Sequence, residues 1–96
     1  MDFQTARISI DDDSFSPRIK AGDHLVVQVR DDVNVGDEVL LRLKNGMRSV
    51  GVLQGSDEDF TSLRNLNSAD VVIYENSDIV AIYYIVEIVR APLARN

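Results

Sequence analysis

One serine stands in a setting that could make it a nucleophile. Ser14 lies in the run Asp-Ser-Phe-Ser-Pro at residues 13–17, which continues through Gly-Asp at 22–23 into an apolar segment. Pro17 fixes its own φ and disfavours the helical region for the residue before it, so this run is predicted to turn and to present the Ser14 hydroxyl. A serine hydroxyl is a weak nucleophile until a neighbouring base accepts its proton. An ordinary turn between two strands is the alternative, because short motifs often occur by chance.

The spacing around this serine resembles a known peptidase loop. The run Asp-Asp-Ser-Phe-Ser-Pro at 12–17, with Gly-Asp at 22–23, is similar to the Gly-Asp-Ser-Met-x-Pro and later Gly-Asp of the LexA-type serine-lysine peptidases. That family includes LexA, the UmuD-type mutagenesis proteins and the C-terminal domains of lambda-type phage repressors. The resemblance implies that Ser14 is the nucleophile position. It also implies that five residues shape the loop, namely Asp13, Phe15, Pro17, Gly22 and Asp23.

The resemblance fails at the catalytic base. In the family, a hairpin strand supplies a lysine, and the corresponding segment here is Val-Gly-Val-Leu at 50–53, with Gly51 at the lysine position. Only thirteen residues precede Ser14, and the Ala-Gly at 21–22 lies within the loop motif rather than upstream as a cleavage site. The resemblance therefore implies a degenerate site in which Ser14 is a relic nucleophile. An active serine-lysine peptidase with an unidentified base is the alternative.

Few other side chains could stand in for the missing base. Lys44 precedes a turn and is expected to be solvated, while Lys20 belongs to the serine loop itself. His24 is the single histidine and could titrate near neutral pH, although a polar residue at the start of a strand is the simpler interpretation. Arg48 stays protonated and cannot accept a proton. A lysine nitrogen within about 3.2 Å of the Ser14 hydroxyl would restore the enzyme interpretation.

The acidic residues predict neither a metal site nor a nucleic-acid surface. Asp11, Asp12 and Asp13 are adjacent, but an EF-hand loop needs alternating ligands, a glycine and a distal glutamate, so a solvated turn is expected. Sixteen acidic residues against ten basic ones give a net charge of −6, which should repel phosphate backbones. No metal and no other cofactor is expected. DNA would be contacted only through an N-terminal domain that these 96 residues lack.

Composition indicates one domain, residues 1–96, in a reducing compartment. The chain has no cysteine, so it contains no disulfide, no thiolate nucleophile and no cysteine-based zinc site. No run of eighteen apolar residues is present, and the start lacks the charged and apolar regions of a signal peptide. We therefore expect a cytoplasmic protein with no membrane partner.

Alternating apolar residues predict a mostly β fold. Strands are expected at residues 4–10, 24–29, 38–44, 47–54, 60–66, 71–74 and 79–90. Within the third of these, Val39, Leu41 and Leu43 are expected to point inward. Asn-Gly at 45–46 predicts a type I′ hairpin turn, which needs two residues at positive φ. The resemblance implies a LexA-type peptidase-like domain, a twisted and partly closed sheet, and an unrelated small β-barrel is the alternative.

The last predicted strand is apolar on both faces. One face should close the core, and the other should meet either a second sheet of the same chain or a second subunit; the pattern leaves both open. The resemblance places this strand near a dimer interface. It implies self-association, as a homodimer or higher assembly, through Tyr83, Tyr84, Ile85, Val86 and Ile88. We therefore expect the C-terminal oligomerisation and regulatory domain of a LexA-like or phage-type transcriptional repressor.

Overall fold

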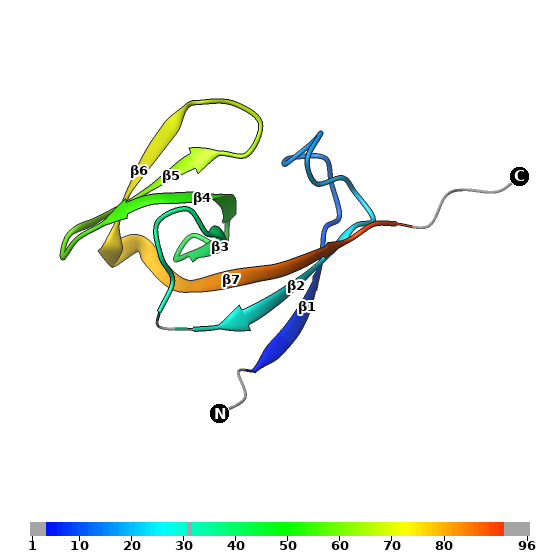
Figure 1. Ribbon diagram of the computed structural model, residues 1–96, viewed down its shortest axis with the longest axis horizontal. Helices are drawn as coiled ribbons and strands as arrows, with labels where there is room; N and C mark the ends of the chain where they lie inside the picture. Colours follow the sequence, from blue (N-terminus) through cyan, green and yellow to red (C-terminus); the bar gives the residue numbers. More distant parts are fainter. Residues whose placement is uncertain (1–3, 31, 92–96) are drawn as a thin grey trace, which may run out of the picture.

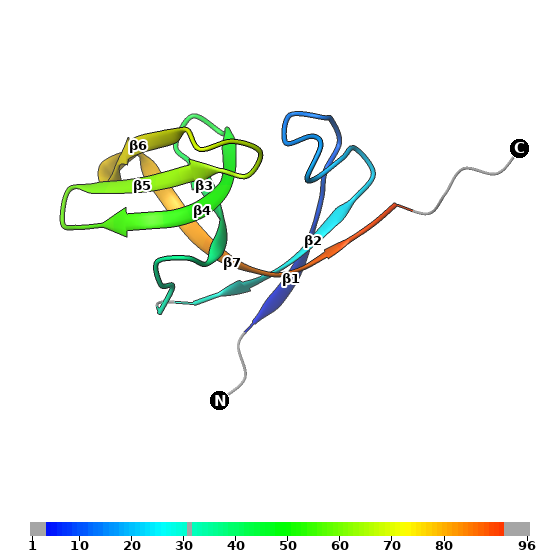
Figure 2. The ribbon, with the colours of Figure 1, turned by 45° about the horizontal axis from the view of Figure 1, so that its top comes forward.

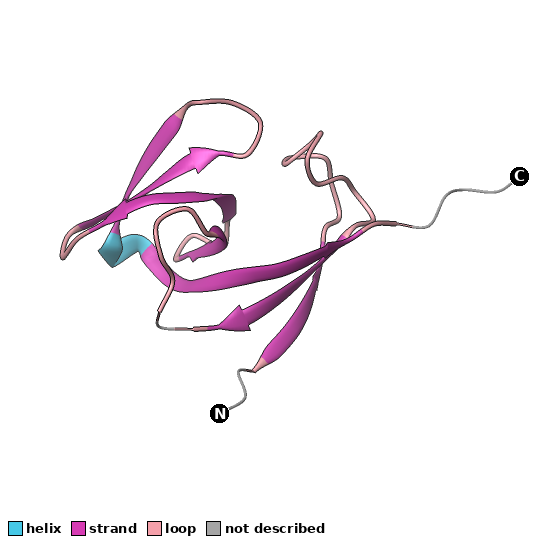
Figure 3. Cartoon of the chain, in the orientation of Figure 1, coloured by secondary structure: helices cyan, strands magenta, loops and turns pink. Residues whose placement is uncertain are grey.

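Seven strands and one short 3-10 turn make up the chain in a computed structural model that describes residues 4–30 and 32–91 (Figures 1 and 3). Within these residues, no helix is both long enough and apolar enough to cross a membrane. The predicted mostly β fold is confirmed. The elements are β1 (Thr5–Ser9), β2 (His24–Val29), β3 (Glu38–Leu43), β4 (Arg48–Ser56), β5 (Phe60–Asn65), β6 (Val71–Glu75), η1 (Asn76–Asp78) and β7 (Ile79–Val89).

All seven strands belong to one antiparallel sheet in the order β1-β2-β7-β3-β4-β5-β6. The last strand of the chain, β7, therefore lies between β2 and β3 and joins the two parts of the sheet. The sheet is strongly twisted but not closed into a barrel, so β1 and β6 form its two edges (Figure 2). The expectation of a twisted sheet is confirmed, and both of its edges are open.

Two apolar clusters fill the space on the two faces of the central strands. The first cluster lies under the loop that joins β1 and β2, and its buried members are Ile10, Ile19, Leu25, Val27, Leu40, Val50 and Ile85. The second lies between β3, β4 and β5, and its buried members are Val39, Leu41, Leu53 and Leu63. The first cluster holds the β1–β2 loop against the sheet, because Ile10 and Ile19 of that loop are among its members.

Strand β3 is covered on both faces. Val39 and Leu41 point into the second cluster as predicted, whereas Leu40 points the other way and is only 1% exposed in the first cluster. Simple alternation would leave Leu40 outside, and that inference is wrong because the β1–β2 loop covers the face on which Leu40 lies. Leu43 is half-buried at the end of the strand.

Two bulges explain the two-faced pattern of β7. The register of β7 shifts once against β3 and once against β2, so that Val80 and Val86 are extra residues that no partner residue opposes. Ile79 and Ile82, on either side of the first shift, pack on the second cluster, whereas Ile85 and Ile88, on either side of the second shift, belong to or pack on the first. A bulge adds one residue, so side chains three positions apart across it lie on the same face. β7 therefore packs on both clusters of this chain, while Val80 and Val86 stay exposed.

The turn between β3 and β4 is not the predicted type I′ turn. Of its residues only Gly46 has positive φ, at +86°, and no non-glycine residue in the described chain has positive φ. The Gly46 N–H donates to the Leu43 carbonyl at 3.0 Å, and the Leu43 N–H donates to the Met47 carbonyl at 2.9 Å. This pattern is a type I turn followed by a bulge at a left-handed glycine. Asn45 instead accepts the Met47 N–H on its side chain.

Candidate functional site

The β1–β2 loop is closed at its base by backbone hydrogen bonds. The Ile10 N–H donates to the Asp23 carbonyl at 3.0 Å, and the Gly22 N–H donates to the Ile10 carbonyl at 2.8 Å. Gly22 has φ +92°, and a Cβ there would lie 3.1 Å from the Ala91 Cβ, so glycine suits this position in both conformation and space. The loop therefore leaves and re-enters the sheet at fixed points.

Asp23 is the main polar anchor of the loop. Its side chain is almost fully buried, and it accepts the Lys20 N–H at 2.9 Å, the Ala91 N–H at 2.9 Å and an Arg90 N–H at 2.8 Å. The hydrogen bonds from the Lys20 and Ala91 backbone, followed by that from Arg90, lower the pKa of Asp23 from 3.8 to about 2. A buried carboxylate with three donors is well satisfied, and it ties the end of β7 to the loop.

A second set of hydrogen bonds, the Asn67 clasp, ties the β1–β2 loop to the other end of the sheet. Asn67, in the loop between β5 and β6, accepts the Arg18 N–H at 3.2 Å and donates to the carbonyls of Phe15 and Ser16 at 3.3 and 3.1 Å. Figure 1 shows these two loops facing each other across the sheet. The sequence predicts only a turn here and does not indicate Asn67 as a partner of the serine loop. No local pattern marks a contact between residues about fifty positions apart.

The remaining predicted loop residues have structural roles. Asp13 accepts the Ala21 N–H on its carboxylate at 3.0 Å and the Ser16 N–H on its carbonyl at 3.0 Å, which shapes the turn. Phe15 is half-buried and packs against the first cluster. Pro17 follows a cis peptide bond and is exposed. The structure thus brings all five predicted loop-shaping residues into one ordered segment.

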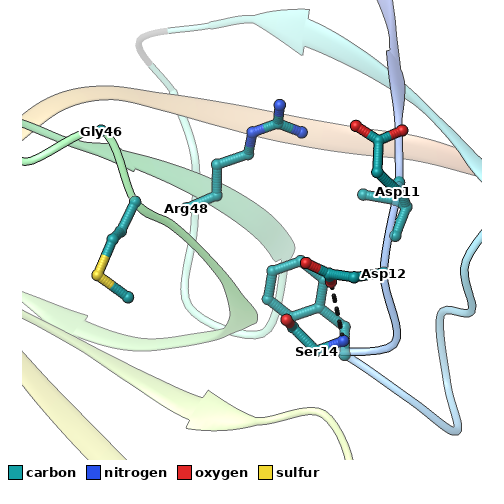
Figure 4. Close-up of a pocket in the computed structure, with 8 residues that line it drawn as sticks. Asp11, Asp12, Ser14, Gly46 and Arg48 are labelled. Carbon is teal, nitrogen blue, oxygen red and sulfur yellow. Dashed lines mark hydrogen bonds between the residues drawn. The ribbon is translucent and has the colours of Figure 1, made fainter.

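Ser14 lies exposed at the wall of a pocket. Its backbone N–H donates to the Asp12 carboxylate at 3.0 Å (Figure 4). Hydrogen bonding from the Ser14 side chain, and then from its N–H, lowers the pKa of Asp12, and the nearby positive charge of Arg48 acts in the same direction. The pocket has a volume of about 340 Å³ and is lined by Ile10, Asp11, Asp12, Ser14, Phe15, Gly46, Met47 and Arg48.

Arg48 supplies the positive charge of this pocket. It projects from β4 toward the wall that carries Asp11 and Asp12 (Figure 4), and its guanidinium donates to the Ser9 carbonyl at 3.3 Å. A guanidinium stays protonated, so it cannot activate Ser14. Asp12 is the hydrogen-bond partner of Ser14, and a carboxylate with a lowered pKa is a weaker base than usual. Neither lysine nor histidine is among the described residues that line the pocket.

The other candidate bases lie in different settings. The His24 ring nitrogen is 3.3 Å from the Ser9 hydroxyl, opposite Ser9 in the β1–β2 ladder. Lys20 is an exposed member of the loop, where its N–H binds Asp23, and Lys44 is exposed at the β3–β4 turn. None of these three side chains lines the pocket that holds Ser14.

Gly51, the position matched to the family lysine, is buried in the middle of β4. A Cβ at this position would lie 2.7 Å from the Arg64 carbonyl oxygen and 3.0 Å from the Leu63 Cβ. Any side chain at residue 51 would therefore point toward β5 and the second cluster and would displace backbone. The neighbouring Val50 instead belongs to the first cluster, against which Phe15 of the serine loop packs. Close approach of β4 and β5 explains the glycine.

The three adjacent aspartates are used by the loop. Asp12 and Asp13 accept backbone hydrogen bonds, and Asp11 is exposed at the pocket wall. Across residues 4–30 and 32–91, no group of three or more histidine, cysteine or acidic side chains is placed to hold a metal ion. Carboxylates that satisfy turn N–H groups are a common structural device.

The residues predicted for self-association lie on β7, mostly against the chain's own core. Ile85 is buried in the first cluster, and Tyr83 and Ile88 pack against it. Tyr84 is half-buried, with the Arg30 guanidinium carbon 4.4 Å from its ring centroid. Val86, the bulged residue, is 48% exposed. Of the five, only Val86 presents a largely open apolar side chain.

Neither a protein-family model nor a curated protein matches the sequence. Function is therefore inferred from the geometry of the loop, the pocket and the surface.

Proposed function

We propose that this chain is a self-association and regulatory domain of the LexA-like or phage-repressor type, cytoplasmic, with a serine loop that no longer cuts. One observation carries the proposal: the loop that holds Ser14 is ordered, but the pocket beside Ser14 contains an arginine where a base would be needed. Asp13 and Asp23 accept backbone hydrogen bonds of the loop, and Gly22 takes the positive φ at its base. The cation in the Ser14 pocket, however, is Arg48, which cannot accept a proton.

The acidic surface supports a role separate from DNA contact. With a net charge of −6, the domain would leave DNA to a separate basic segment and would join two such segments together. Linking two DNA-binding parts makes the second DNA contact intramolecular and raises the apparent affinity. Self-association is then the property on which regulation acts.

Reactivity of Ser14 tests the first half of this proposal. A fluorophosphonate probe should label the wild type no more than Ser14→Ala, because no neutral base stands beside the hydroxyl. A second pair, Arg48→Lys with and without Ser14→Ala, asks whether an amine at this position changes the result. Labelling of the wild type that depends on Ser14 would contradict the degenerate site and favour the peptidase.

Sedimentation equilibrium over a wide concentration range tests the second half. The wild type should show reversible association. Val86→Asp tests whether β7 takes part, with Val35→Asp as the control because Val35 is 66% exposed in the β2–β3 loop. Weaker association in Val86→Asp alone would place the contact on β7, and equal association in the two variants would place it elsewhere on the surface. A chain that stays monomeric at every concentration would remove the assembly role.

A further inference from the structure

The β6 edge carries the most exposed apolar strand of the described chain. Val71, Val72 and Ile73 are 50%, 48% and 66% exposed, and Phe60 beside them on β5 is 46% exposed. The register pairs Ser62 with Ile73 and Phe60 with Glu75, so Val71, Ile73 and Phe60 share one face of the sheet. An apolar edge of this kind is a ready template for another strand.

The hydrogen-bond pattern identifies which β6 backbone groups point outward. The Asn65 N–H donates to the Asp70 carbonyl at 2.8 Å, and the Asn76 N–H donates to the Asp59 carbonyl at 2.8 Å, so residues 70 and 76 face β5. Because backbone groups alternate in direction along an antiparallel strand, residues 72 and 74 also face β5. The N–H and C=O groups of Val71, Ile73 and Glu75 therefore point to the open edge.

We infer that β6 pairs with β6 of a second copy of this chain, antiparallel, with Ile73 opposite Ile73. The inference rests on the proposed self-association and assigns it a surface. In this register Val71 lies opposite Glu75 of the second copy, and the outward groups of residues 71, 73 and 75 meet their counterparts. Two open edges are removed, and the two sheets become one continuous sheet.

Strand length and charge select this register. A pairing centred on Val72 would set Val71 opposite Ile73, but Glu75 would then lie opposite Ala69 in the β5–β6 turn. A pairing centred on Glu75 would set two glutamates directly opposite, which is unfavourable. A pairing centred on Val71 would bring Ile73 against Ala69 in the β5–β6 turn. Only the pairing centred on Ile73 gives every outward residue of β6 a partner within β6 of the second copy.

The same register brings opposite charges into one row. Arg64 pairs with Val71, and Phe60 pairs with Glu75, across the β5–β6 ladder. In the proposed dimer, Val71 of one copy lies between Arg64 of the same copy and Glu75 of the second copy. All three side chains lie on one face of the sheet. Within residues 4–30 and 32–91, neither Arg64 nor Glu75 forms an ion pair. Self-pairing thus supplies each with a nearby opposite charge.

Engineered cysteines test the register directly, because the natural chain has none. Directly opposed residues of a hydrogen-bonded antiparallel pair have Cα atoms about 5.5 Å apart, within disulfide range. Ile73→Cys should therefore form a linked dimer on mild oxidation. Val71→Cys alone should not, since its two copies would be about 13 Å apart along the strand. A mixture of Val71→Cys and Glu75→Cys should link as a heterodimer.

Sedimentation equilibrium of Ile73→Lys completes the test without a covalent bond. The dissociation constant should rise at least roughly tenfold relative to wild type, while Val35→Lys, at an equally exposed loop position, should leave it unchanged. Circular dichroism confirms that both variants are folded. Equal linking of Val71→Cys and Ile73→Cys, or association that is unchanged in Ile73→Lys, would overturn the β6 pairing alone. A wild type that never associates would overturn it together with the proposed function.

Discussion

The two edge strands of the sheet, β1 and β6, differ in the polarity of their exposed side chains. At the β1 end the edge strand shows exposed polar residues, among them Thr5 and Arg7, and the loop that follows is held by hydrogen bonds to the carboxylates of Asp23 and Asp13. At the β6 end the edge strand shows valine and isoleucine, and its outward peptide groups have no partner strand within the described chain. A charged edge resists pairing, whereas an apolar edge favours it.

This difference separates stability from assembly. A hydrogen-bond network around a buried carboxylate contributes to folding only while every donor and acceptor is matched, so each loss is costly. An exposed apolar edge contributes little to the isolated fold but gains when it is covered. Substitutions near Asp23 should therefore change the melting temperature, whereas substitutions on β6 should change the molar mass of the assembly in solution.

Asp23→Ala should have the largest effect on stability. It removes the acceptor of two backbone N–H groups and of Arg90 in a site that is almost fully buried. We expect Tm to fall by roughly 10 °C or more, measured by thermal circular dichroism. Asp11→Ala, at an exposed position on the same loop, is the control. A variant as stable as that control would show that Asp23 is not the anchor.

Asn67→Ala should have an intermediate effect. It removes the clasp between the β5–β6 loop and the serine loop, three hydrogen bonds made by an exposed side chain. The free energy of unfolding should fall by about 1 kcal/mol, and amide exchange should accelerate at residues 15, 16 and 18. Gln54→Ala, at an exposed position on β4, provides the comparison by urea denaturation. Unchanged exchange in the loop would argue against the clasp.

The acid dependence of stability should show a smaller effect. Asp23 has a folded pKa of about 2 against an ordinary 3.8, so its ionised form stabilises the fold above about pH 4. That contribution is lost as the pH falls through about 2. The Tm difference between wild type and Asp23→Asn should therefore narrow from pH 4 to pH 2. A constant difference would mean that the charge of Asp23 is not what stabilises the loop.

The double variant Thr5→Val/Arg7→Val should change stability least. Both side chains are exposed, so the free energy of unfolding should change by less than about 0.5 kcal/mol. The variant gives β1 the apolar character of β6, and light scattering should detect larger assemblies because each chain then has two apolar edges. Assemblies no larger than those of wild type would mean that edge polarity does not control pairing.

Much of the fold follows from local sequence pattern. Each strand was predicted within a few residues, since alternating valine, isoleucine and leucine report a half-buried pleated strand. Leu40 was misplaced, because alternation assumes one covered face, and β3 has two. The Asn-Gly turn is not of the predicted type. Only Gly46 takes positive φ, and Asn45 uses its side chain as a hydrogen-bond acceptor.

The candidate site was less predictable than the fold. A defined conformation of the serine loop could be expected from Asp13, Gly22 and Asp23, because turn residues act locally. The Asn67 clasp and the place of Arg48 across from Asp12 depend on strands that meet only in three dimensions. The apolar pattern of β7 predicts cover on both faces but does not distinguish this chain from a second subunit. The contacts of β7 with the two clusters depend on the bulges at Val80 and Val86, and bulges leave no reliable local signal.

The contact between Asp23 and the end of β7 also has a mechanical consequence. Arg90 and Ala91 are gripped directly after the strand ends, and Arg90 also donates to the Arg18 carbonyl at 2.6 Å. A pulling load applied to the chain beyond residue 91 would reach these contacts before it reached the β2–β7 ladder. The end of β7 would therefore separate from Asp23 before the strands of the sheet separate from one another.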